Sequence, residues 1–276
     1  MSGLTLTAGL SFSGGFTFTE APPQNTAAWF AGGGGDGAAV YYRSTVQRIT
    51  FATDTDTASV RGPLSRNMQY LAAASNLTAG WFGGGNNNVD GGNGSNVDRI
   101  TYATDTATAA VRGPLSVSRY HSAATGNTTD GWFGGGYTSP SVSSTVNRIT
   151  YATDTDTASV RGPLSGARAY LAATGNTYDG WFAAGYVSGS GGRSTVDRIT
   201  YATDTATASV RGPLSLIRYS LAAAGNTTDG WFGGGYGSSP SLTVQRVTWA
   251  NDTATASTRG PLSSARYNLA AAGGMQ

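Results

Sequence analysis

A unit of about fifty residues recurs five times along this chain of 276 residues. Each copy carries a Trp-Phe pair, and an Arg-Gly-Pro-Leu-Ser segment follows 28 to 32 residues later. Successive copies lie 48 to 52 residues apart, a period that indicates one compact structural unit per copy, packed against its neighbours. The tryptophans are Trp29, Trp81, Trp132, Trp181 and Trp231, and the arginines are Arg61, Arg112, Arg161, Arg211 and Arg259.

Turn residues divide each unit into four short strand candidates. In the last complete copy these are residues 218–224, 231–235, 243–249 and 256–259. Gly, Asn and Asp in the intervening turns tolerate positive φ, and Pro261 ends the fourth strand because it has no N–H for a further ladder bond. Four antiparallel strands make one blade, so we predict an all-β, five-bladed β-propeller.

The strand count predicts that the ring closes on itself. The second, third and fourth strands occur five times each, but no first strand precedes Trp29, and its fifth copy is residues 266–272. We expect this C-terminal strand to complete the N-terminal blade and remove the unpaired edges. The expected organisation is an arm at 1–27 and a propeller at 28–276, with blades at 28–65 plus 266–273, 66–116, 117–165, 166–215 and 216–263.

The unit resembles the kelch repeat in layout. An arginine precedes the first strand, the apolar second strand ends in a glycine doublet, the third strand reads Val-Xaa-Arg, and the fourth leads to the next arginine. The resemblance covers about residues 27–273 and implies the propeller fold. The tryptophan lies on the second strand instead of late in the blade, and kelch proteins typically have six or seven blades. The functions of kelch families are therefore not carried over.

Residues that recur in every unit are expected to build the fold. All 17 basic residues are arginine, whose planar donor fork suits buried hydrogen bonding better than a flexible ammonium. The alternative interpretations are five anion sites for the arginines, sugar stacking for the Trp-Phe pairs, and calcium binding for the Asp-Thr-Asp turns. The recurring residues are Arg48, Arg99, Arg148, Arg198 and Arg246 on the third strand, Arg119, Arg168, Arg218 and Arg266 on the first, and Asp54, Asp105, Asp154, Asp204 and Asp252 in the third turn.

Composition excludes several classes of function. The net charge of +2 is too small to indicate binding to nucleic acid or anionic membranes. The sequence contains no run of eighteen apolar residues that could span a membrane. Cysteine is absent, His121 is the single histidine, and Glu20 is the single glutamate. We therefore predict no catalytic residues, no cofactor, no metal site and no enzymatic activity.

The loops between the second and third strands differ among the copies. They are rich in tyrosine, serine, glycine and asparagine, a composition typical of adaptable recognition loops. The alternative is that these are surface loops whose sequences vary and that bind no ligand. The predicted ligand-binding residues on this rim are Tyr41, Tyr42, Arg43, Asp90, Tyr137, Tyr186, Arg193 and Tyr236.

Residues 1–27 are not part of the repeat. Even positions from 4 to 18 are apolar or glycine and odd positions are mainly threonine and serine, a pattern that predicts a strand with one buried face. It packs along the outside of a blade or, as we favour, adds to a partner's sheet, with Pro22-Pro23 as a stiff spacer. The predicted partner-binding residues are Leu4, Leu6, Leu10, Phe12, Phe16 and Phe18.

The glycine-punctuated arm and the Thr/Ala/Gly-rich propeller repeats resemble bacteriophage virion structural proteins, particularly those of marine phages. The resemblance implies a non-enzymatic virion surface protein, attached to tail or capsid through the arm, with the rim facing host glycans or neighbouring subunits. Other virion proteins would then be its partners, and a homo-oligomer is possible. The alternatives are a five-bladed lectin or bacterial adhesion module, extracellular or on the cell surface, and a glycan-active enzyme.

Overall fold

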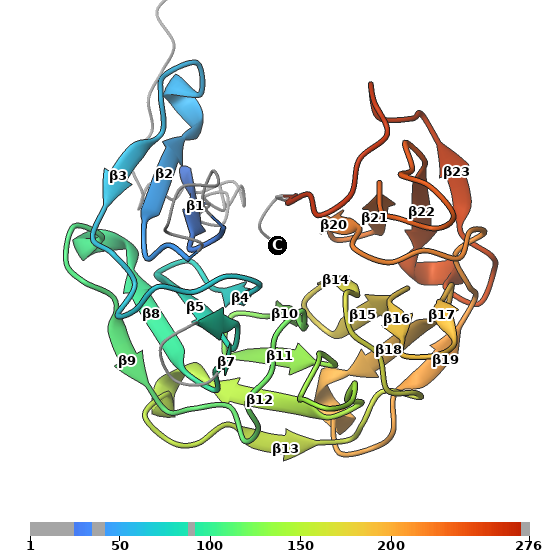
Figure 1. Cartoon of the computed structure of the whole chain (residues 1–276), viewed down its shortest axis with the longest axis horizontal. Coiled ribbons are helices and arrows are strands. Elements are labelled where there is room, and N and C mark those ends of the chain that lie inside the picture. The colour runs from blue at the N-terminus through green and yellow to red at the C-terminus, as the bar shows by residue number, and fades with distance from the viewer. Residues whose placement is uncertain (1–24, 35–41, 88–91, 272–276) are drawn as a thin grey trace, which may run out of the picture.

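The structure is a computed structural model that describes residues 25–34, 42–87 and 92–271. Over these residues the chain is an all-β, five-bladed β-propeller without α-helices, which confirms the predicted fold class. Five small sheets surround a central axis, and the innermost strands of blades two to five face it (Figure 1). The predicted arm residues Leu4, Leu6, Leu10, Phe12, Phe16 and Phe18 lie outside the described residues.

Each complete blade is an antiparallel meander whose strands run from the axis to the circumference. Blade three has the order β10 (Ala123–Gly126), β11 (Asp130–Gly134), β12 (Val146–Thr150) and β13 (Ser159–Arg161). Blade two consists of β4 (Ala72–Ser75), β5 (Ala79–Gly83), β8 (Val97–Thr101) and β9 (Ala110–Arg112); blade four of β14 (Ala172–Gly175), β15 (Asp179–Ala183), β18 (Val196–Thr200) and β19 (Ser209–Arg211); and blade five of β20 (Ala222–Gly225), β21 (Asp229–Gly233), β22 (Val244–Thr248) and β23 (Ser257–Arg259).

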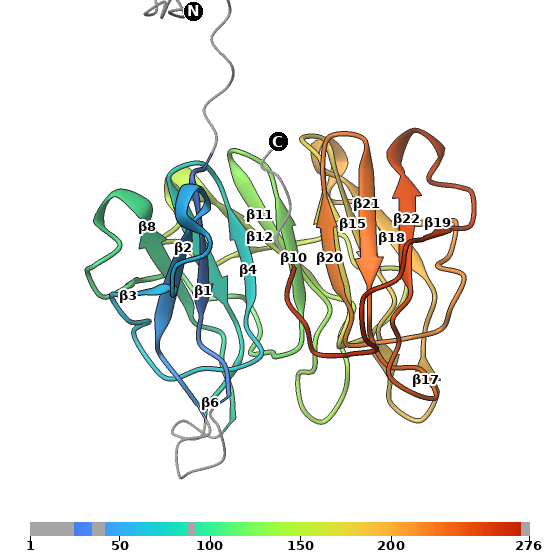
Figure 2. The same ribbon diagram turned by 90° about the horizontal axis from the view of Figure 1, so that it is seen from above.

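Short elements connect these strands at the two ends of the ring. A 3₁₀ turn follows every third strand, and two of the loops between second and third strands form small hairpins, β6 (Asn86–Asn87) with β7 (Gly92–Asn93) and β16 (Tyr186–Val187) with β17 (Gly191–Gly192). Figure 2 shows β6 and β17 at the lower edge, and we call this end the lower face and the opposite end the upper face. The 3₁₀ turns are η1 (Phe51–Thr53), η2 (Tyr102–Thr104), η3 (Tyr151–Thr153), η4 (Tyr201–Thr203) and η5 (Trp249–Asn251).

The Trp-Phe pair fills the space on both sides of each blade. Consecutive strand residues point to opposite faces of a sheet, so the two rings face different neighbours. In blade three, Trp132 stacks on Tyr201 of blade four with a centroid distance of 3.8 Å. Phe133 faces blade two, where a Cβ on Gly83 would lie 2.9 Å from its ring. The glycine therefore permits the close approach of neighbouring sheets, and Trp132 and Phe133 are buried core residues.

A buried aspartate joins each of blades two to five to the preceding blade. Trp81 Nε1 donates to Asp154 Oδ2 at 2.8 Å, Arg99 Nη1 donates to the same oxygen at 3.0 Å, and Arg112 Nε pairs with it at 3.4 Å. Two hydrogen bonds and one further ion pair thus compensate the burial of a carboxylate that is 5% exposed. The same cluster recurs at Asp105, Asp204 and Asp252, each bound by the tryptophan and two arginines of the preceding blade.

Three of the arginines that precede first strands, Arg119, Arg168 and Arg218, are buried inside their own blades, whereas Arg266 is exposed. Arg119 donates to Gly135 O, Thr145 O and Asn147 Oδ1 at 3.0, 2.8 and 2.7 Å. Burial lowers the pKa of Arg119 to about 10, which still leaves the side chain charged at neutral pH. These bonds fasten the loop between second and third strands to the start of the first strand, and so agree with the framework interpretation of the repeated arginines.

Blade one differs from the other four because it has three strands in the described residues, β1 (Ala27–Ala31), β2 (Val46–Thr50) and β3 (Ser59–Arg61). The predicted first strand at 266–272 is not formed there: residues 266–271 make one isolated bridge, from Arg266 to Ser241 of blade five, and Ala272 lies outside the described part. The physical reason is that the ring is open between blades one and five (Figure 1), so this segment has no sheet beside it. The predicted arm boundary at 27 falls within β1.

Candidate functional site

The lower face is shaped by a sharp bend in each connection between blades. Tyr70, His121, Tyr170, Ser220 and Asn268 occupy equivalent positions just before the first strands, with φ between 53° and 60°. Such left-handed conformations are costly for residues other than glycine and need support from their surroundings. The support is a ladder of backbone hydrogen bonds around the axis. Each of these residues except Tyr70 donates its N–H to the carbonyl of the equivalent residue in the preceding blade, at N–O distances of 3.2, 2.9, 2.8 and 2.9 Å.

This ladder brings aromatic rings from successive blades into contact. His121 lies between Tyr70 and Tyr170, with centroid distances of 3.9 and 3.8 Å. Tyr170 lies 6.0 Å from Tyr219. These rings stack because residues at equivalent positions in consecutive blades project from the same side of the ladder.

Tyrosines of the rim loops extend the cluster outward. The first residue of each loop pairs with the connection of its own blade through a backbone bridge, as between Tyr120 and Tyr137 and between Tyr219 and Tyr236. The ring centroids of these two pairs are 5.3 and 5.6 Å apart, distances usual for aromatic contacts. We call the resulting nine rings the tyrosine surface; they are Tyr70, Tyr120, His121, Tyr137, Tyr170, Tyr186, Tyr219, Tyr236 and Tyr267.

Three rings of the tyrosine surface line a cavity of about 530 Å³ at the lower end of the axis. Tyr70, His121 and Tyr170 line it together with leucine side chains and with polar groups that include Gln69 and Asn268. Tyr70 is 43% and Tyr267 50% exposed, and the other seven rings are half-buried. Rings that are held in place and still reach solvent can contact a ligand with little loss of side-chain entropy.

The structure brings together three of the eight predicted rim residues. Tyr137, Tyr186 and Tyr236 belong to the tyrosine surface. Arg193 is bound by its own loop, since Nη1 donates to Ser190 O at 2.9 Å and Gly192 O at 3.0 Å. Tyr42 and Arg43 lie in the loop of blade one and are not among the nine rings, and Tyr41 and Asp90 lie outside the described residues.

Sequence reasoning missed the other six rings of this surface. Three of them belong to an Arg-Tyr dipeptide that the repeat pattern assigned to the first strand, as in Arg119-Tyr120. In the structure β10 begins at Ala123, and the residues before it form the bend. The residue after this arginine position differs from copy to copy, and this difference was the signal that could have revealed a functional surface. The residues are Gln69, Tyr120, Ala169, Tyr219 and Tyr267.

His121 is uncharged at neutral pH in this setting. Burial between two tyrosine rings lowers its pKa to about 4, from an ordinary value near 6.5. Burial likewise raises the pKa of the Tyr170 hydroxyl. These two rings are therefore uncharged at neutral pH, and the surface offers ring faces, phenol hydroxyls and backbone groups to a ligand.

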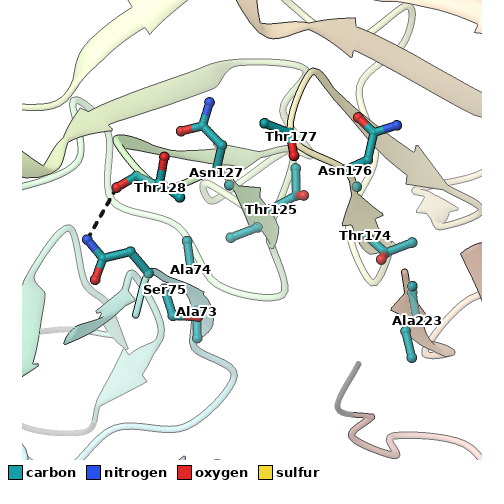
Figure 3. Close-up of a pocket in the computed structure, with 16 residues that line it drawn as sticks. Ala73, Ala74, Ser75, Thr125, Asn127, Thr128, Thr174, Asn176, Thr177 and Ala223 are labelled. Carbon is teal, nitrogen blue, oxygen red and sulfur yellow. Dashed lines mark hydrogen bonds between the residues drawn. The ribbon is translucent and has the colours of Figure 1, made fainter. Parts of the chain in front are cut away.

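The upper end of the axis has different chemistry. A cavity of about 250 Å³ lies here, lined by β4, β10, β14, β20 and the turns that follow these strands. Figure 3 shows the residues that line it. Its lining side chains are alanine, serine, threonine and asparagine, without an aromatic ring. Asn127 Oδ1 already accepts the N–H groups of Thr129 and Asp130, both at 2.9 Å. The lower face is thus the stronger candidate site.

No group of three or more histidine, cysteine or acidic side chains that could hold a metal ion occurs within the described ranges. In the same part of the chain, none of the helices has the length and apolar character required to span a bilayer.

The fold is similar to that of a known kelch-repeat protein. Among solved structures, YjhT matches with a TM-score of 0.72 and 12% sequence identity, over 91% of this chain and 85% of that chain. At this identity the likeness shows the β-propeller fold alone. No protein-family model matches the sequence, and no curated protein matches it either.

The depressed pKa of His121 predicts a loss of stability in acid. Between pH 6.5 and pH 4 the unfolded chain binds a proton at His121 that the folded chain does not, so acid favours unfolding. We expect the free energy of unfolding of the wild type to fall relative to that of His121→Gln across this window, by up to about 3 kcal/mol. Urea unfolding at pH 7 and pH 4 measures the difference, and an equal gap between the two proteins at both pH values would contradict it.

Proposed function

We propose that this protein is a non-enzymatic carbohydrate-binding protein of a virion surface, and that the tyrosine surface contacts host glycans. The observation that carries the proposal is the contiguous set of nine aromatic side chains on the lower face, three of which line a cavity of about 530 Å³. Cavities of this size accommodate small ligands. Tyrosine is a residue of recognition surfaces because it combines a large apolar area with a polar hydroxyl.

The chemistry of the surface suits an uncharged sugar. A pyranose presents an apolar face of C–H groups, which can lie against a tyrosine ring, and hydroxyls, which can bond to phenols and backbone groups. His121 is neutral at physiological pH, and Arg193 of the rim loop in blade four is bound to carbonyls of that loop. A neutral surface gives no electrostatic attraction to nucleic acid or to a strongly charged protein.

The buried carboxylates of the described blades support a binding role over catalysis. Glycoside hydrolysis usually requires two carboxyl groups on either side of a substrate bond. Asp105, Asp154, Asp204 and Asp252 are held by tryptophan and arginine between the blades, and Asp197 pairs with Arg168 at 2.9 Å. These groups are occupied by the framework, and none of them lines the cavity on the lower face.

The virion setting rests on the resemblance of the sequence to phage structural proteins. The alternating pattern in residues 1–27 suits strand addition to a partner's sheet. Attachment through the arm would leave the ring free to present the tyrosine surface.

Loss of the loop tyrosines should weaken glycan binding. We expect the triple variant Tyr137→Ala, Tyr186→Ala, Tyr236→Ala to bind about tenfold more weakly or worse, because three stacking rings contribute at least the 1.4 kcal/mol that corresponds to a tenfold change. Binding is measured on a glycan array and then by titration with the best hit, using the full chain.

Tyr178→Thr provides the matched control. Tyr178 is a 74% exposed tyrosine in the upper turn of blade four, where blades three and five carry Thr129 and Thr228. The Tyr178→Thr variant should bind the glycan like the wild type. Thermal unfolding establishes that every variant is folded. An array without hits for the wild type, or equal binding by the triple variant, would refute the proposed site.

The arm is tested by deleting residues 1–24. The cut leaves β1 intact, together with Asn25, whose Nδ2 donates to Asn76 O at 3.4 Å. We expect the shortened chain to keep the melting temperature of the full chain but to be missing from purified particles that incorporate the full chain. Equal incorporation of both would rule out anchoring through the arm.

A further inference from the structure

Three blades carry an aspartate at the first residue of the second strand, near the upper face. In blade three, Asp130 Oδ1 accepts a hydrogen bond from Thr150 Oγ1 at 2.6 Å and lies 3.6 Å from Arg148 Nε. Asp179 and Asp229 make the same two contacts in blades four and five, at 2.5 and 2.7 Å to the threonine and at 3.7 and 3.4 Å to the arginine. A carboxylate, a threonine hydroxyl and an arginine Nε thus form a recurring unit.

Blade two has the threonine and the arginine of this unit without the carboxylate. Ala79 is the residue opposite Thr101, as Asp130 is opposite Thr150. Arg99 binds Asp154 through Nη1 at 3.0 Å, and its buried Nε has no hydrogen-bond partner or carboxylate within the described residues. The side chains of Arg99 and Thr101 therefore keep the binding capacity that their counterparts use on an aspartate.

The charges between blades two and three do not balance. Between blades three and four, two arginines pair with two aspartates. Between blades two and three, Arg99 and Arg112 pair with Asp154 alone in the described part of the chain. Two positive charges thus meet one negative charge, and the excess positive charge favours an anion at this interface.

A cavity of about 600 Å³ lies at this interface, between β5 of blade two and the upper turn and 3₁₀ turn of blade three. Its lining includes Ala79, Arg99, Thr101 and Trp81 from blade two and Tyr151 from blade three. Arg99 is the single charged side chain among the lining residues. A cavity of this size accommodates a small ligand, and its one cationic group would bind one acidic group of that ligand.

The lining also contains a buried hydroxyl without a partner. Tyr151 OH makes no hydrogen bond among the described residues, whereas its counterpart Tyr201 OH bonds to Thr125 Oγ1 at 3.1 Å. The residue of blade two that corresponds to Thr125 is Ala74. Two alanines, Ala74 and Ala79, therefore stand at this interface where other blades have polar side chains.

We propose that this cavity binds the carboxylate of a small polyhydroxy acid, with Arg99 and Thr101 as its ligand-binding residues. The carboxylate would contact Arg99 Nε and Thr101 Oγ1 as the Asp130 carboxylate contacts Arg148 and Thr150. Hydrogen bonds between a guanidinium group and a carboxylate are among the strongest available to a protein in water.

The remaining lining suits the hydroxyl groups of such a ligand. The upper turns of blades two and three contribute Asn76, Thr78, Thr128 and Thr129. Thr78 Oγ1 donates to Asn76 Oδ1 at 2.9 Å, and Thr129 Oγ1 donates to Asn127 Oδ1 at 3.0 Å. Because these hydroxyls donate within the protein, they keep lone pairs that accept hydrogen bonds from ligand hydroxyls.

This site is independent of the tyrosine surface. The two cavities share no lining residue, and they lie at opposite ends of the ring. The polyhydroxy acid site can therefore fail its test while the glycan site on the lower face holds, and the reverse is equally true.

The first test follows the indole N–H signals of the full-length protein by NMR. Sodium gluconate is the probe, sorbitol is its uncharged counterpart, and sodium chloride keeps the ionic strength equal. We expect gluconate to shift the signal of Trp81, identified by its loss in Trp81→Phe, and to do so saturably. The signal of Trp181 should not move, because blade four carries Asp179. An equal response to sorbitol, an equal shift of Trp181, or no saturable shift would each overturn the proposal.

Two reciprocal variants locate the carboxylate. Ala79→Asp supplies the carboxylate from the chain itself and should weaken gluconate binding at Trp81 by about tenfold or more, the change expected from loss of a charge-assisted contact. Asp130→Ala should reproduce the arrangement of blade two in blade three and make the Trp132 signal respond to gluconate. An unchanged Trp81 response in Ala79→Asp, or a folded Asp130→Ala protein whose Trp132 signal ignores gluconate, would contradict the assigned roles.

The second test measures stability without any ligand. Ala79→Asp should raise the melting temperature by about 2–4 °C, because Arg99 and Thr101 gain the partner that their counterparts have. Ala79→Asn, which has the same shape without the charge, is the matched control and should raise it less. If Ala79→Asp melts at or below the temperature of Ala79→Asn, the cavity does not favour a carboxylate and the proposal is wrong.

Discussion

The aspartate buried between consecutive blades is the interaction on which the rest of the structure depends. Burial of a carboxylate is unfavourable unless donors replace its water, and here an indole N–H and two guanidinium groups do so. These donors come from one blade and the aspartate from the next, so the cluster is satisfied at a single relative position of the two sheets. Repetition of the cluster at Asp105, Asp154, Asp204 and Asp252 sets the curvature of the ring.

This framework leaves the lower face free to vary. The clusters, the stacked aromatics and the buried Arg119, Arg168 and Arg218 hold the blades without help from the tips of the rim loops. Residues at the bends can therefore differ between blades, as Tyr70, His121 and Ser220 do, while the backbone ladder keeps them at equivalent places. Equivalent places in adjacent blades are also adjacent in space, so separate substitutions create one continuous aromatic surface.

The fold could be predicted from the sequence because the repeat determines it. The Trp-Phe spacing, the turn residues and the strand count were sufficient to predict five blades, and four of them have the predicted four strands in the described residues. The function of Asp154 was not foreseen, because a turn aspartate has the same local pattern whether it is exposed or bound by the preceding blade. Tyr120 and Tyr219 were missed as site residues because positive φ at the next position cannot be inferred from an Arg-Tyr sequence. Tyr137, Tyr186 and Tyr236 were predicted because their loops vary in composition.

The central claim is that each inter-blade aspartate and its donors act as one unit. A double-mutant cycle between Trp81→Phe and Asp154→Ala tests it directly, because Trp81→Phe removes the indole N–H donor and keeps an aromatic ring. The quantity to measure is the free energy of unfolding in urea for the wild type, both single variants and the double variant. The account predicts a coupling of about 1 kcal/mol or more, and effects that add to within about 0.5 kcal/mol would contradict it.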